Sequence, residues 1–124
     1  MFLNKQEKKI SKQYLDQGYV IQDIKEIQYL NWMREFFCKT IVKTLPKLKK
    51  DKPENILNNI HKHFPISNLN KFRLDIFNKI NSVKQFRENF YKISKPLVDI
   101  IVGNEVSMQL RVNLSIQLPK DDSS

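Results

Sequence analysis

Six apolar residues alternate with five polar residues near the end of this 124-residue chain. A period of two predicts a β-strand with one apolar face and one polar face. The residues before it carry the three- and four-residue spacing of amphipathic helices, so the strand has almost no partner strands within the sequence. The apolar positions are Met108, Leu110, Val112, Leu114, Ile116 and Leu118, and the polar ones are Gln109, Arg111, Asn113, Ser115 and Gln117.

Helical patterns cover most of the chain before this strand. Asn4 and Glu7 have the spacing of a capping box at a helix start, and Gly18 stands where a left-handed residue ends a helix. A last helical stretch through Phe90 is expected to break at Pro96, because proline cannot donate the helical hydrogen bond. The earlier helices are expected over residues 5–17, 24–45, 53–64 and 67–80.

These patterns together predict a mainly α fold with a long C-terminal β-strand. The chain is expected to form a single domain, with a helical region at residues 1–103 and the strand at residues 106–118. Because a strand needs hydrogen-bonding partners on its edges, we expect the rest of its sheet to lie outside these 124 residues. The sequence therefore predicts the helical N-terminal portion of a larger, incomplete fold.

The chain is strongly basic, with a formal net charge of +9. Six lysines are predicted to form a basic ridge from the second helix into the linker that follows it. Arginine, which makes bidentate contacts to phosphates and bases, is scarce here, so a solvated face is favoured over nucleic-acid binding. The alternative is that the ridge binds nucleic acid or an acidic protein partner. Lysine greatly outnumbers arginine and alanine is absent, so an AT-rich coding sequence also accounts for much of the charge. The ridge comprises Lys39, Lys43, Lys47, Lys49, Lys50 and Lys52.

Few residues suit catalysis or metal binding. Gly18 and Gly103 are the only glycines, which excludes a glycine-rich phosphate-binding loop. His61 and His63 stand two residues apart on a predicted helix, so their side chains point in different directions and do not chelate one metal ion. Cys38 falls within an apolar helical stripe and is predicted to be a buried, inert thiol. We therefore expect no catalytic residue and no metal site in this chain.

The sequence also bears on cellular location. Its longest apolar run, Ile100-Ile101-Val102, is far too short to span a membrane. The chain becomes charged after three residues, where a signal peptide would need a longer apolar stretch. A single cysteine fits a reducing compartment. We expect a cytoplasmic protein without a membrane segment.

The polar face of the predicted strand offers a second candidate site. Short neutral donors and acceptors beside one arginine suit a pocket for a carboxylate or a sugar. In a barrel or jelly roll, such a face meets water or lines a cavity. We predict that the substrate or cosubstrate pocket is lined by Arg111, Asn113, Ser115 and Gln117.

Both ends of the chain resemble phytanoyl-CoA dioxygenase-like, Fe(II)/2-oxoglutarate-dependent oxygenases. The residues that carry the likeness are Asp16 to Ile21, followed by a helix over Asp23 to Phe37, and the terminal stretch from Gln109 to Ser124. The terminal stretch is similar to the strand and turn that precede the iron-binding His-x-Asp in a bacterial branch associated with carbohydrate biosynthesis. The resemblance implies a double-stranded β-helix, or jelly-roll, fold that uses Fe(II) and 2-oxoglutarate.

The iron-binding residues of that family do not occur here. The family's iron needs two histidines and a carboxylate, and this sequence contains no His-x-Asp. The resemblance therefore implies an inactive N-terminal fragment of an oxygenase for a small, sugar-derived substrate, completed by a complementary C-terminal chain. The alternative from the residues alone is a small basic helical module that binds nucleic acid or an acidic protein.

Overall fold

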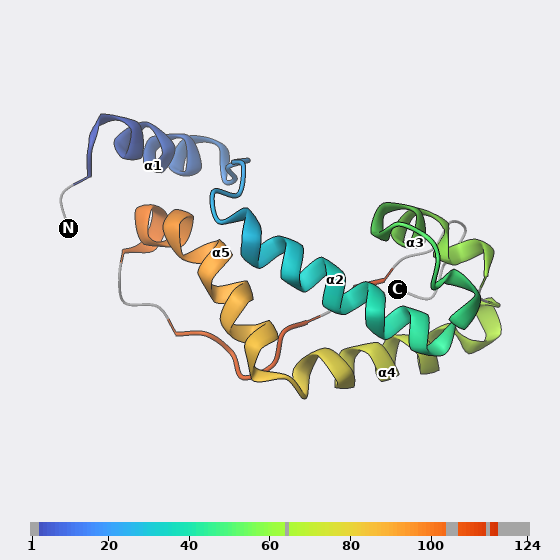
Figure 1. Ribbon diagram of the computed structural model, residues 1–124. Coiled ribbons are helices and arrows are strands. Elements are labelled where there is room, and N and C mark those ends of the chain that lie inside the picture. Colours follow the sequence, from blue (N-terminus) through green and yellow to red (C-terminus); the bar gives the residue numbers. More distant parts are fainter. Residues whose placement is uncertain (1–2, 64, 104–106, 114, 117–124) are drawn as a thin grey trace.

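The computed structural model describes residues 3–63, 65–103, 107–113 and 115–116, with the side chain of Ile66 excepted. Helices account for most of these residues, and Figure 1 shows how they are arranged. Three short 3-10 turns lie between the second and fourth helices: η1 (Pro46–Leu48), η2 (Ile60–Lys62) and η3 (Ile66–Asn68). The α-helices are α1 (Lys5–Gln17), α2 (Ile27–Thr44), α3 (Pro53–Asn59), α4 (Leu69–Asn81) and α5 (Lys84–Val102).

The first helix has both of the ends that its sequence predicts. The Asn4 side chain accepts a hydrogen bond from the Glu7 amide at 2.9 Å, and the Glu7 carboxylate accepts one from the Asn4 amide at 2.7 Å. Gly18 ends the helix with φ at +78°, a conformation that L side chains rarely adopt. The capping box and the glycine C-cap are thus confirmed, and α1 packs beside α5 through the buried Ile10.

Helix α2 is the centre of the fold and packs against α3, α4 and α5. Trp32 stacks on Phe36 with ring centroids 5.3 Å apart, and Phe36 meets Phe86 of α5 at 5.8 Å. Burying each large apolar side chain of this kind contributes roughly 1.5–3 kcal/mol to folding. The buried core consists of Met33, Cys38, Ile41, Leu48, Ile56, Ile60, Leu69, Phe72, Ile76, Ile80, Phe86 and Val112.

The expected break at Pro96 is wrong, because α5 continues through this residue to Val102. A proline inside a helix removes one hydrogen bond, and its ring crowds the carbonyl four residues earlier, at a cost of about 3 kcal/mol. An ion pair between Lys95 and Asp99 spans the proline on the helix surface. The Gly103 amide then donates to the Asp99 carbonyl at 3.1 Å and closes the helix. Helix α5 is therefore continuous on both sides of Pro96.

The predicted C-terminal strand is also wrong. Residues 107–113 and 115–116 contain no strand and form an irregular run along α4 and α5 (Figure 1). The described residues include no strand that could pair with this run. Side chains of the helices hydrogen-bond its backbone instead. The described part of the chain is thus a small, all-helical structure instead of helices followed by a long strand. Residues 104–106, Leu114 and residues 117–124 of the predicted strand region lie outside the described residues.

The alternating pattern does not give this run one buried face and one exposed face. Val112 is buried with 7% of its surface exposed, and Met108 and Ile116 pack against the core. Leu110, which the alternation places on the same face, is 82% exposed. The chain bends at Leu110 and Arg111, so among the described residues Met108, Val112 and Ile116 face the core and Leu110 does not. The bend therefore replaces strand periodicity with contacts to the helices.

Candidate functional site

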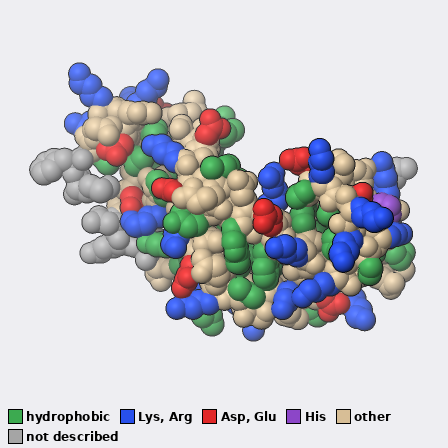
Figure 2. All heavy atoms as spheres, viewed as in Figure 1, with side chains coloured by type: hydrophobic (Ala, Val, Ile, Leu, Met, Phe, Trp, Pro, Cys, Tyr) green, Lys and Arg blue, Asp and Glu red, His purple; other side chains and the backbone are tan. Residues whose placement is uncertain are grey.

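Six exposed lysines lie on the last turns of α2 and on the segment up to α3. Lys39 and Lys43 stand four residues apart on α2 and so share one side of that helix. The others lie in η1 and in the turn that follows it. Figure 2 shows Lys and Arg side chains gathered over the part of the molecule that carries α3 and the end of α2. The lysine surface consists of Lys39, Lys43, Lys47, Lys49, Lys50 and Lys52.

Apolar anchors hold this segment in place. Pro46 follows the end of α2 and starts η1, while Pro53 occupies the first turn of α3. Between the two prolines, Leu48 is only 2% exposed and belongs to the buried core. Because Leu48 points inward, its neighbours Lys47 and Lys49 are turned to solvent. Core packing therefore fixes the backbone from which the lysines project.

The ion pairs of the described residues use other basic side chains. Lys12 pairs with Asp16 at 2.5 Å on α1, Lys84 pairs with Glu88 at 3.3 Å on α5, and Lys95 pairs with Asp99. Arg34 reaches Glu54 at 3.6 Å. None of the six lysines of the lysine surface forms an ion pair with a carboxylate in residues 3–63, 65–103, 107–113 and 115–116. Their charges are therefore available to a ligand.

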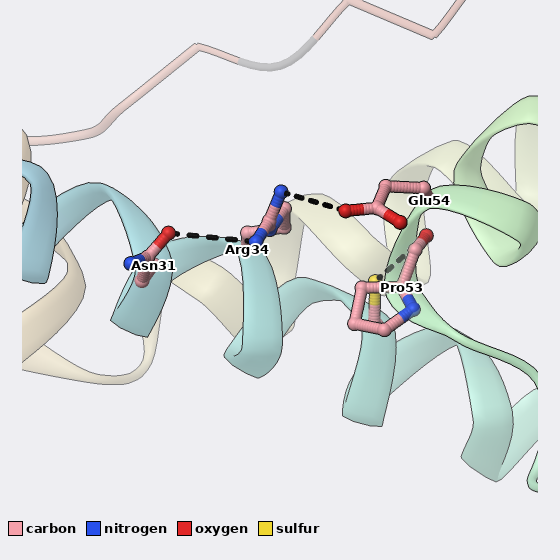
Figure 3. A network of polar contacts seen from close by, with 5 residues as sticks. Asn31, Arg34, Pro53 and Glu54 are labelled. Atoms are coloured by element: carbon pink, nitrogen blue, oxygen red, sulfur yellow. Dashed lines mark hydrogen bonds and ion pairs between the residues drawn. The ribbon is translucent and has the colours of Figure 1, made fainter.

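Figure 3 shows the polar contacts of Glu54, at the start of α3. The Arg34 guanidinium lies between Glu54 and Asn31, and Nη2 donates to the Asn31 Oδ1 at 3.4 Å. Arg34 Nε is buried without a hydrogen-bond partner among the described residues. The contact ties α2 to α3 and gives the Glu54 carboxylate a partner in Arg34.

Cys38 lies one turn beyond Arg34 on α2 and is 4% exposed, which confirms the predicted burial. Its Sγ donates to the Pro53 carbonyl oxygen at 3.8 Å, a weak contact that joins α2 to the start of α3. Burial raises the pKa of the Cys38 thiol, and the nearby Arg34 charge opposes that shift. The thiol is therefore protonated at neutral pH, which makes it a packing group and a poor nucleophile.

The residues predicted to line a substrate pocket lie on the irregular C-terminal run. Arg111, Asn113 and Ser115 are exposed, and the Arg111 guanidinium lies 5.9 Å from the centre of the Phe77 ring. Gln117 lies outside the described residues. A separate open cavity of about 220 Å³ beside α5 is lined by Phe90, Tyr91, Ser94, Lys95, Val98, Asp99, Ser107 and Met108.

Sequence reasoning missed the role of the arginines in this lysine-rich chain. Each of the four arginines makes a specific contact. Arg34 binds Glu54, Arg73 and Arg87 bind carbonyl oxygens of the C-terminal run, and Arg111 covers Phe77. A planar guanidinium supplies several donors in fixed directions, which lysine cannot do. In a composition biased toward lysine, the scarcity of arginine is the signal that could have marked these four positions.

Other classes of site find no support in this structure. Among the residues that the structure places, no group of three or more His, Cys, Asp and Glu side chains could hold a metal ion. The same residues include no helix long and apolar enough to cross a membrane. No protein-family model, curated protein or solved structure matches the chain.

Proposed function

We propose that this chain is a small helical module that binds nucleic acid through the lysine surface, in a reducing cytoplasm. The observation that carries the proposal is the set of six exposed lysines without ion-pair partners in the described structure. The formal net charge of +9 adds a long-range attraction for any polyanion. The single buried cysteine is compatible with a reducing compartment.

Lysine charges bind phosphates mainly by releasing the counterions condensed on the nucleic acid. An ammonium group is a compact point charge on a flexible stem, so it follows a phosphate backbone without reading the bases. Residues 39–52, which carry the lysine surface, contain no arginine, asparagine or glutamine that would read base edges in a groove. Binding is therefore expected to be independent of sequence and sensitive to salt.

The oxygenase hypothesis stays a prediction, and it has lost its structural premise. It depended on a long strand that would form the first wall of a jelly roll, and the described residues 107–113 and 115–116 form no strand. Fe(II), 2-oxoglutarate, a small-molecule substrate and a complementary C-terminal chain belonged to that hypothesis. No contact in the described structure favours it over a binding module.

A charge-matched pair of triple variants tests the proposal. One variant carries Lys39→Gln, Lys43→Gln and Lys47→Gln, and its control carries the same change at three exposed lysines of α1. Both variants lose three positive charges, so they differ only in where the charges are lost. We expect the first variant to bind a fluorescent DNA duplex at least about tenfold more weakly than the native chain. The control lysines are Lys5, Lys8 and Lys9.

Fluorescence anisotropy at one fixed salt concentration measures both variants. Equal weakening of the two variants would show that net charge alone drives binding and would remove the lysine surface as the site. An acidic peptide of glutamates, used as a competitor, tests the second kind of partner. If the native chain bound this peptide more tightly than the duplex, an acidic protein would replace nucleic acid as the ligand.

A further inference from the structure

Side chains of α4 and α5 hold the C-terminal run at three points. Arg87 donates through Nη2 to the Met108 carbonyl and through Nε to the Gln109 carbonyl, both at 3.0 Å. Asn81 binds the amide and the carbonyl of one residue near the middle, Val112. Arg73 donates through Nε to the Ile116 carbonyl at 2.7 Å. The three side chains therefore bind the backbone of the run near its two described ends and its middle.

All of these hydrogen bonds are made to the backbone of the run and none to its side chains. The two bonds from Asn81 require the Val112 N–H and C=O to point to the same side, as they do in an extended residue. Backbone recognition of this kind accepts an extended segment regardless of most of its side chains. The face thus has the chemistry of a receptor for the backbone of a peptide segment.

Side-chain selectivity comes from the inward positions of the run. Met108, Val112 and Ile116 recur every four residues and pack against the core, whereas Leu110 stays in solvent. The three backbone-binding side chains occur in the order 87, 81 and 73 along the run, so the run lies antiparallel to the chain direction of α5 and α4. A ligand must therefore present apolar side chains at the positions that Met108, Val112 and Ile116 occupy, in this one direction.

We propose that the face of α4 and α5 formed by Arg73, Asn81 and Arg87 is a binding site for a peptide segment, and that its occupant in trans is the C-terminal run, residues 107–113 and 115–116, of a second copy of this chain. Within one chain, this segment already meets both requirements: its backbone is hydrogen-bonded by the three side chains, and its inward side chains are apolar. The same contacts form whether the segment comes from the same copy or from another, which makes exchange between copies a low-cost route to a dimer. The proposal is independent of the lysine surface.

Attachment to the same chain gives the segment a high effective concentration at its own site, so the native chain is expected to be mostly monomeric. Two complementary variants remove this advantage. Val112→Asp damages the segment and leaves the site intact, while Asn81→Leu damages the site and leaves the segment intact. Neither variant can form the full contact within its own chain or with another copy of itself. The intact segment of an Asn81→Leu chain can, however, bind the intact site of a Val112→Asp chain. Mixing the two is therefore expected to give a one-to-one heterodimer.

Light scattering after size-exclusion chromatography, at high micromolar concentration, gives the masses of each variant and of the mixture. A heterodimer in the mixture, with each variant monomeric alone, is the expected result. A mixture that stays monomeric would overturn the proposal. Loss of the helical circular dichroism signal in Val112→Asp would also overturn it, because the segment would then be part of the fold and could not exchange.

A peptide titration provides the second measurement. A fluorescent peptide of residues 107–116 is titrated into the native chain and into Val112→Asp, and a peptide carrying the same aspartate serves as its control. We expect the native-sequence peptide to bind Val112→Asp at least about tenfold more tightly than the native chain, whose site is filled. Equal affinity of the two chains, or equal binding of the two peptides, would contradict a backbone-binding site with a Val112 pocket.

Discussion

The side chain of Asn81 binds both backbone polar groups of Val112. Its Oδ1 accepts from the Val112 amide at 2.7 Å, and its Nδ2 donates to the Val112 carbonyl at 3.0 Å. A neighbouring strand would satisfy the same two groups in a sheet. One asparagine at the end of α4 therefore takes the place of a partner strand, which explains why a strand-like sequence is stable here without a sheet.

Asn81→Leu is expected to lower the free energy of unfolding by about 2–4 kcal/mol, because it leaves the two partly buried polar groups of Val112 without partners. Urea unfolding followed by circular dichroism measures the change. Asn78→Leu, at an exposed position on the same helix, is the control and should stay within about 0.5 kcal/mol of the native chain. Equal effects of the two substitutions would contradict the role given to Asn81.

Alanine substitutions at Val112 and Leu110 test whether the C-terminal run has the observed structure or forms a strand with one apolar face. Val112 is 7% exposed and Leu110 is 82% exposed, although the alternation places both on one face. We expect Val112→Ala to cost about 2 kcal/mol and Leu110→Ala less than about 0.5 kcal/mol in urea unfolding. Similar large losses at both positions would indicate a strand with a buried face.

Pro96→Ala is expected to stabilise the chain by about 1–3 kcal/mol, because the substitution restores an N–H donor within a continuous helix. Thermal unfolding followed by circular dichroism should show a higher midpoint. Pro53→Ala is the matched control, since Pro53 lies in the first helical turn, where the missing N–H has no partner to lose. A lower midpoint for Pro96→Ala would show that α5 needs a break at this residue.

The Cys38 thiol predicts how stability depends on alkaline pH. Burial holds its folded-state pKa above the ordinary value of 9.0, so the folded chain keeps the proton that the unfolded chain releases. Its contribution to stability is complete below the unfolded-state pKa and falls as the pH rises through the folded-state pKa. Cys38→Val removes this titration. Above pH 9, the free energy of unfolding of this variant should therefore fall less steeply with pH than that of the native chain. Parallel pH profiles from urea unfolding would contradict this assignment.

Local sequence signals were enough to predict most of the helical part of the fold, although the break expected at Pro96 is wrong. The capping box at Asn4, the C-cap at Gly18 and the burial of Cys38 each depend on residues within one or two turns, and all three are confirmed. The C-terminal run could not be predicted in this way. Its conformation depends on Arg73 and Asn81, which lie 43 and 31 residues from the backbone groups that they bind.

The candidate site also depends partly on local sequence signals and partly on contacts between distant residues. The exposure of the lysine surface depends on local features, namely the helical spacing of Lys39 and Lys43 and the prolines on either side of Leu48. Whether those lysines are already neutralised depends on carboxylates elsewhere in the fold. The pairing of Arg34 with Glu54 across α2 and α3 is a tertiary contact that no local pattern reveals.

The salt dependence of duplex binding is the decisive measurement for nucleic-acid binding by the lysine surface. The slope of log affinity against log salt concentration reports how many phosphates the protein neutralises, at about 0.9 per phosphate. We predict a steep slope for the native chain. The slope should become shallower by about 0.9 for each phosphate that the Lys39, Lys43 and Lys47 triple variant no longer neutralises, and it should not change in the Lys5, Lys8 and Lys9 control. Equal slopes for the native chain and the first variant, or no duplex binding by the native chain at low salt, would contradict nucleic-acid binding through this surface.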